Sequence, residues 1–126
     1  MKGLEFVFLA GGSVLGAFLR YKIIESPLLF NTIPLNVLIV NVLGAFILGM
    51  FVIFSEQWNL DTKYALFGAV GFCGSLTTMS SFALDSSNLL DNRHYVGFTI
   101  NILANVGLSI AALIGGKSLI NAIING

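Results

Sequence analysis

The side chains of this sequence that could do chemistry are uncharged amides and hydroxyls inside long apolar runs. Asn101, Asn105 and Ser109 are spaced i, i+4 and i+8, which predicts one polar stripe on a helix. Asn41 lies within another apolar run. Amides and hydroxyls donate hydrogen bonds, and no Asp or Glu lies in the middle of an apolar run to repel an anion. This set suits an anion or a small neutral solute. Hydrogen bonding between helices explains the stripe and Asn41 equally well.

The apolar runs lack the residue types that several classes of membrane protein and enzyme need. A proton-coupled transporter or a cation pathway usually places a carboxylate inside the membrane, and its absence argues against both. Cys73 is the one cysteine and His94 the one histidine, so neither belongs to a metal cluster or a nucleophile–base pair of its own kind. A lone cysteine of this sort usually acts as a small hydrophobe. We therefore expect that the protein is not an enzyme.

The composition indicates an integral membrane protein. The chain has 126 residues, of which 56% are hydrophobic and 10% charged, with a mean hydropathy of +0.93. Soluble domains carry about 25% charged residues. The formal net charge is zero and no basic run is present, which disfavours a nucleic-acid partner. A soluble enzyme, a nucleic-acid binder and a disordered chain are all excluded as leading interpretations.

Four apolar runs predict an all-α membrane protein with a single transmembrane domain over residues 1–126. A helix needs about 20 apolar residues to cross the hydrocarbon layer. Runs of this length cover about residues 4–24, 34–54, 64–84 and 95–114. The polar residues between 85 and 94 are expected to form a loop. The loops are too short to hold a catalytic domain outside the bilayer.

The third run is unusual because glycines and hydroxyl residues occupy its centre. Gly68, Gly71 and Gly74 precede a stretch rich in Ser and Thr. Such a run disfavours a continuous helix. Non-helical backbone at membrane depth is tolerated only where it is buried in protein or lines a wet cavity. We therefore expect the third helix to be broken in the middle of the membrane, close to the functional site.

The positive charges give no preferred orientation in the membrane. Each side carries three: Lys2, Lys63 and Lys117 on the side of the termini, and Arg20, Lys22 and Arg93 on the other. Lys and Arg near the span ends normally set the topology. A chain without a bias can insert both ways and pair as an antiparallel dimer. The alternative is that one orientation prevails through features other than the charge count.

Five further positions each allow two interpretations. Gly12 and Gly16 form a small-residue face that lets helices approach closely, within one subunit or between two. Arg20 reaches the headgroups or places positive potential at a pore mouth. Met79 and Phe82, spaced i, i+3, pack in a core by default. Alternatively, the positive edge of an aromatic ring holds a small anion there.

Three segments resemble one known family, the CrcB/Fluc fluoride channels. Residues 71–82, GFCGSLTTMSSF, are similar to that family's GFCGGLTTFSTF. Residues 11–21, GGSVLGAFLRY, resemble its GGxxGAxxRY with one extra residue between the glycines. Residues 41–46, NVLGAF, are similar to its NxxGxF. The resemblance extends over nearly the whole chain in length and in the order of spans.

The resemblance implies a fluoride-selective channel that passively exports fluoride and lowers its cytoplasmic concentration. It implies an antiparallel, dual-topology homodimer in the inner (plasma) membrane, with two pores. A structural sodium ion would lie at the dimer centre, held by the backbone carbonyls of Gly74 and Thr77. By motif position, the pore residues would be Asn41, Met79, Ser80, Phe82, Asn101, Asn105 and Ser109.

Two departures from the family pattern fall on these pore positions. Met79 replaces a phenylalanine, and Asn101 replaces a larger phenol. A thioether is polarizable but lacks the positive ring edge. We expect such changes to alter the rate of passage rather than the ion chosen.

Two rival functions remain. A small dual-topology exporter would need a glutamate inside the first span, and a structural membrane subunit would leave the glycine-rich third span unexplained.

Overall fold

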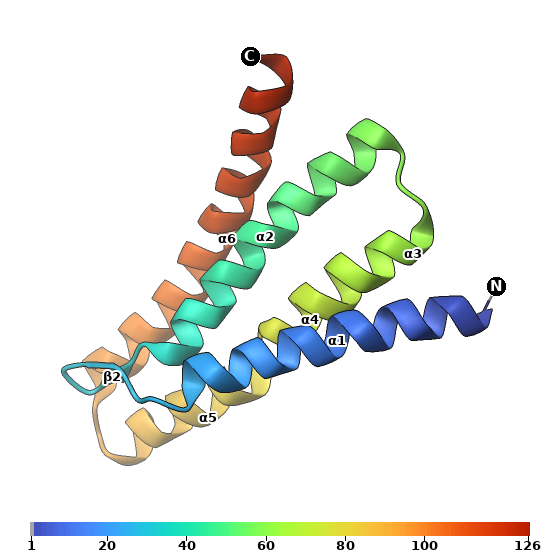
Figure 1. The fold of residues 1–126 in the computed structure, drawn as a ribbon. Coiled ribbons are helices and arrows are strands. Elements are labelled where there is room, and N and C mark those ends of the chain that lie inside the picture. Colours follow the sequence, from blue (N-terminus) through green and yellow to red (C-terminus); the bar gives the residue numbers. More distant parts are fainter. Residues whose placement is uncertain (1) are drawn as a thin grey trace.

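The computed structural model describes residues 2–126 and is almost entirely helical (Figure 1). Four of its helical stretches are long and apolar enough to cross a membrane: Lys2–Ile24, Asn36–Trp58, Thr62–Asp91 and Tyr95–Asn125. They occur in the predicted order and contain the predicted runs almost completely. The protein is therefore an all-α, multi-pass membrane protein.

The first two spans are joined by a small hairpin that an asparagine holds in place. α1 (Lys2–Ile24) leads to β1 (Leu29–Phe30) and β2 (Ile33–Pro34), an antiparallel pair, and then to α2 (Asn36–Trp58). The buried Asn36 amide accepts a hydrogen bond from the Leu28 backbone N–H at 2.7 Å. It donates to two backbone carbonyls, at 2.7 and 2.8 Å. This one side chain thus fixes the turn between the spans.

The third span is broken in its middle, as the sequence predicts. It consists of α3 (Thr62–Ala65), a π-helical segment η1 (Leu66–Cys73), the single turn α4 (Gly74–Leu76) and α5 (Met79–Asp91). Between α4 and α5 the backbone is extended, with φ −81° and ψ 156° at Thr77 and φ −148° and ψ 120° at Thr78. The chain therefore leaves and re-enters the helical conformation within two residues.

Three predicted helix ends differ from the structure. α5 continues to Asp91, so most of the loop expected at residues 85–94 is helical. α6 (Tyr95–Asn125) has 31 residues and passes the expected end at residue 114, while α2 continues to Trp58 rather than 54. The predicted ends follow the last residue of each apolar run. The helices continue through polar residues in α5 and α2, and α6 continues through a second, partly apolar segment over residues 115–125.

The helices pack in two pairs, and glycines allow the close approach in each. α1 lies along the third span, and α2 lies along α6 (Figure 1). A methyl group at Gly12 would overlap the backbone carbonyl of Phe67, and one at Gly116 would overlap that of Phe46. Small residues at such contacts are the usual means of helix association in membranes.

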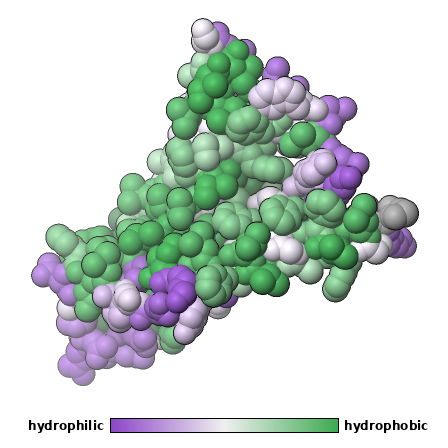
Figure 2. All heavy atoms as spheres, in the orientation of Figure 1, coloured by the Kyte–Doolittle hydropathy of each residue, from purple (hydrophilic) through white to green (hydrophobic). Residues whose placement is uncertain are grey.

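The surface is mainly apolar, with polar residues gathered toward the ends of the helices (Figure 2). Large hydrophobic side chains face outward along every span, as expected for contact with lipid or with another subunit. Within residues 2–126 the largest fully buried side chains are Leu76, Val40, Asn101 and Cys73. A polar amide is therefore among the most deeply buried groups of the fold.

Candidate functional site

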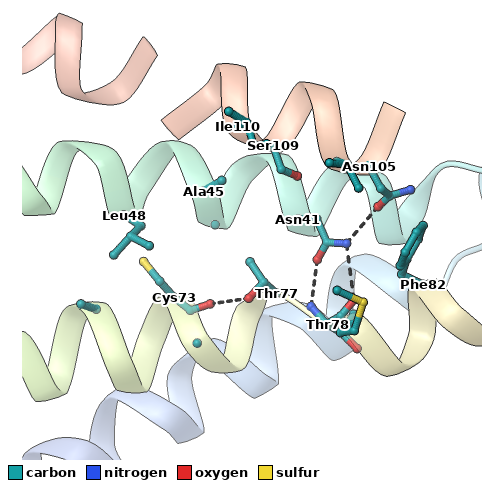
Figure 3. A pocket seen from close by; sticks show the side chains of 15 residues that line it. Asn41, Ala45, Leu48, Cys73, Thr77, Thr78, Phe82, Asn105, Ser109 and Ile110 are labelled. Carbon is teal, nitrogen blue, oxygen red and sulfur yellow. Dashed lines mark hydrogen bonds between the residues drawn. The ribbon is translucent and has the colours of Figure 1, made fainter. Parts of the chain in front are cut away.

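A cavity of about 410 Å³ lies between α2, the break in the third span and α6 (Figure 3). Most of its lining is apolar, and none of the lining residues is acidic. The structure places seven residues singled out from the sequence on its walls: Asn41, Gly74, Thr77, Met79, Phe82, Asn105 and Ser109. Asn101 adjoins it through hydrogen bonds, and Ser80 follows Met79 at the start of α5. The cavity therefore joins segments that are far apart in the sequence.

Asn41 clamps the broken backbone from α2. Its Oδ1 accepts a hydrogen bond from the Thr78 N–H at 2.8 Å, and its Nδ2 makes a longer contact of 3.4 Å with the Thr78 carbonyl (Figure 3). In an unbroken helix the Thr78 N–H would donate to the Gly74 carbonyl. The side chain thus replaces a lost helical hydrogen bond and satisfies a buried donor that would otherwise be costly.

Arg20 reaches the same break from α1. Its Nη1 donates to the Ser75 carbonyl at 3.0 Å, and the side chain is half-buried. In a continuous helix that carbonyl would accept from the Met79 N–H. Neither interpretation of Arg20 from the sequence, headgroup contact or pore-mouth charge, includes this bond. The contact brings a permanent positive charge to the interrupted backbone.

Two carbonyls at the break lose their helical donors. The Thr78 N–H is taken by Asn41, which frees the Gly74 carbonyl. The Ser81 N–H donates to Thr78 Oγ1 at 3.1 Å instead of the Thr77 carbonyl, as in a helix N-cap. Within residues 2–126 no group of three or more His, Cys, Asp or Glu could hold a metal. Backbone carbonyls are therefore the donors that the break offers to a hard cation.

A chain of amide hydrogen bonds extends from the break into α6 and back to α5. Asn41 Nδ2 donates to Asn105 Oδ1 at 2.9 Å (Figure 3). Asn105 Nδ2 donates to the Asn101 carbonyl and Oδ1 at 2.9 and 3.1 Å, and Asn101 Nδ2 donates to Ser86 Oγ at 3.1 Å. Asn101 and Asn105 are only 1% and 5% exposed. Two members of the predicted stripe, Asn101 and Asn105, thus belong to a hydrogen-bonded network that joins three helices.

Ser86 is a member of this network that the sequence pattern does not predict. It is buried on α5, four residues after Phe82. A helix that continued past residue 84 would have placed both on one face. The expected loop at 85–94 hid that spacing.

The remaining predicted positions differ in their exposure and in their hydrogen bonds. Ser109 Oγ is buried and has no hydrogen-bond partner within residues 2–126. Ser80 is exposed, with its Oγ 3.2 Å from Thr78 Oγ1. Met79 is 73% exposed, while Phe82 is half-buried at the end of the cavity where Asn105 lies (Figure 3). Gly12 and Gly16 pack against the backbone of η1 within the subunit.

A family model described as "CrcB-like protein, Camphor Resistance (CrcB)" matches residues 7–117. The chain belongs to the CrcB family. CrcB relatives with curated names agree: the chain is 76% identical to "Fluoride-specific ion channel FluC" of Nitrosopumilus maritimus, over 99% of both chains. A protein of the same name from Sulfurihydrogenibium is 42% identical, over 89% of this chain and 93% of the relative. The CrcB family is one of ion channels, not enzymes. In this CrcB chain the helix break lies beside the cavity, and Asn41 and Asn105 are among the few polar residues that line it.

Proposed function

We propose that this protein is a passive, fluoride-selective channel that exports fluoride and lowers its cytoplasmic concentration. The observation that carries the proposal is the 76% identity, over 99% of both chains, with a protein named for fluoride conduction. The cavity supports it, because buried hydrogen-bond donors and an aromatic ring meet there without an acidic side chain.

The chemistry of fluoride accounts for the kind of groups present. Fluoride is small and strongly hydrated, so a pore must replace its water with donors at close range. In the proposal, the pathway is lined by Asn41, Met79, Ser80, Phe82, Asn101, Asn105 and Ser109. The Ser109 hydroxyl, which has no partner within residues 2–126, is a donor available to an anion. Phe82 contributes its positive ring edge, which the Met79 thioether cannot.

The proposed assembly is an antiparallel, dual-topology homodimer in the cell membrane with two pores. Two observations support a partner of the same sequence. Met79 and Gly74, beside the cavity, are exposed on a single subunit, and the positive charges are balanced between the two membrane faces. A second copy in the opposite orientation would cover the exposed Met79 and Gly74. The balanced positive charges allow such a copy to insert.

The proposed structural sodium ion would be held by the carbonyls of Gly74 and Thr77. Both lose their helical donors at the break, whereas the neighbouring Ser75 carbonyl is taken by Arg20. Bound there, the cation would join the two copies. We expect purified dimers to unfold at a lower temperature when potassium replaces sodium. Equal stability in both salts would contradict a sodium site.

The channel itself is tested by ion release from liposomes that contain the purified protein. We expect rapid fluoride efflux down its gradient, measured with a fluoride electrode, and no chloride efflux in parallel vesicles. Efflux that requires a proton gradient would indicate a small exporter instead. Folded protein without any fluoride efflux would favour a structural subunit.

A further inference from the structure

The Thr78 backbone selects one of the two orientations of the Asn41 amide. The Thr78 N–H can only donate, so Asn41 must present Oδ1 to it, at 2.8 Å. Nδ2 of Asn41 then makes the long contact of 3.4 Å with the Thr78 carbonyl and has a second hydrogen to donate toward α6. There it needs an acceptor, and Asn105 Oδ1 provides one at 2.9 Å.

Asn105 is held in the complementary orientation by its own helix. Its Nδ2 lies 2.9 Å from the Asn101 backbone carbonyl, which can only accept, and 3.1 Å from Asn101 Oδ1. An amide nitrogen carries two hydrogens, so both are engaged. Asn105 thus turns its acceptor to Asn41 and keeps no donor for an anion.

We propose that Asn105 is a positioning residue that acts on ion passage through Asn41 rather than by contact with the ion. It fixes the Asn41 amide so that this amide clamps the Thr78 peptide at the helix break. The proposal narrows the role of one residue in the proposed channel and rests on that function for its transport test. Ser109, one turn further along α6, is the matched contrast, because its buried hydroxyl has no partner within residues 2–126.

The transport test is a pair of double-mutant cycles on fluoride efflux. Asn105→Leu, of similar size but without an acceptor, is expected to lower efflux roughly tenfold, as for the loss of a buried hydrogen bond. In an Asn41→Ala background it should change efflux less than about twofold, because residues that act as one unit are not additive. Ser109→Ala should lower efflux by the same factor in both backgrounds. If Asn105→Leu lowers efflux by the same factor in the wild-type and the Asn41→Ala backgrounds, the proposal is wrong.

A second measurement does not depend on transport. Hydrogen exchange of the backbone amides over residues 77–82 reports whether Asn41 still protects the Thr78 N–H. We expect faster exchange there in Asn105→Leu and unchanged exchange in Ser109→Ala. Unchanged exchange in Asn105→Leu would overturn the proposal. Asn105→Ala replaces Asn105→Leu if the latter does not purify in folded form.

The two measurements also separate this proposal from the proposed function. A wild-type protein that releases no fluoride would refute the channel, while the exchange experiment would still decide whether Asn105 positions Asn41. A wild-type protein that conducts, with additive cycles and unchanged exchange, would refute only the role of Asn105.

Discussion

Asn36 and Asn41 lie five residues apart on α2, and the side chain of each forms hydrogen bonds with backbone groups. Asn36 satisfies one N–H and two carbonyls of the first turn, so it holds a loop. Asn41 satisfies the Thr78 N–H at the helix break and also bonds to Asn105. An asparagine therefore holds a loop at position 36, whereas an asparagine at position 41 shapes the cavity. The difference lies in the unpaired backbone that each one meets.

The replacement of Met79 by phenylalanine tests the aromatic contribution to ion passage. Met79 is 73% exposed on the subunit, so Met79→Phe should leave the stability of the fold within about 0.5 kcal/mol of wild type. A ring edge that stabilises the passing anion by about 1 kcal/mol would raise fluoride efflux roughly fivefold. Efflux from liposomes measures this, with chloride exclusion unchanged. Met79→Leu, which adds no ring, is the control and should behave like wild type. Equal efflux in all three proteins would contradict a role for a ring here.

The spacing of residues in the sequence predicted the common face of Asn101, Asn105 and Ser109, since helix geometry alone decides it. The direction of the hydrogen bonds between the amides was not predictable. It depends on the Thr78 N–H and the Asn101 carbonyl, and the first of these is available only because the helix breaks there. Tertiary contacts therefore decide the role of each polar residue, whereas periodicity decides its place.

At the scale of elements, the break in the third span is held by side chains from two neighbouring helices. Asn41 of α2 takes the Thr78 N–H, and Arg20 of α1 takes the Ser75 carbonyl. Each replaces a partner that a continuous helix would supply. The interrupted segment is thus stabilised from both helix pairs, and its shape depends on how those pairs cross.

The removal of Arg20 should loosen the break. Arg20→Ala deletes the charge-assisted hydrogen bond to Ser75, and bonds of this kind contribute about 1.5–3 kcal/mol. We expect a lower free energy of unfolding in detergent and faster amide exchange over residues 77–82. Lys22→Ala is the matched control from the same turn of α1. Lys22 makes an exposed pair with Glu25 at 3.4 Å, and such pairs add little to stability. If the two variants are equally stable, Arg20 does not hold the break.

The glycines of the third span predicted that a break exists but not where it lies. Gly74 is helical, with φ −64° and ψ −30°, and the extended residues are Thr77 and Thr78. Gly71 instead packs where a methyl group would crowd the backbone of α1 at Leu9. In membranes, small residues allow close helix contact, and glycine also weakens a helix. The sequence alone does not distinguish these two uses.

At the scale of the whole molecule, the subunit is thin and its apolar surface is extensive (Figure 2). Among residues 2–126 most side chains are at least partly exposed, and the cavity, with its mainly apolar lining, lies close to exposed residues such as Met79. A water-filled path needs a wall on every side, since lipid cannot face unpaired polar groups. The shape of the single subunit therefore favours the proposed dimer over a monomer in the bilayer.

The proposed dual topology predicts that function depends on both orientations being present. The positive charges are balanced at three on each side, so two added lysines should fix one orientation. The pair Gln57→Lys and Thr62→Lys loads the side of the termini, and the pair Ser26→Lys and Asn92→Lys loads the other. All four positions are exposed.

We expect each double variant, expressed alone, to lose most of its fluoride efflux, because an antiparallel pair cannot form from a single orientation. Co-expression of the two should restore efflux, because together they supply both orientations. Efflux from cells loaded with fluoride measures each case, and equal amounts of protein in the membrane provide the control. A double variant that conducts fully by itself would show that one orientation is sufficient, and the antiparallel dimer would then be wrong.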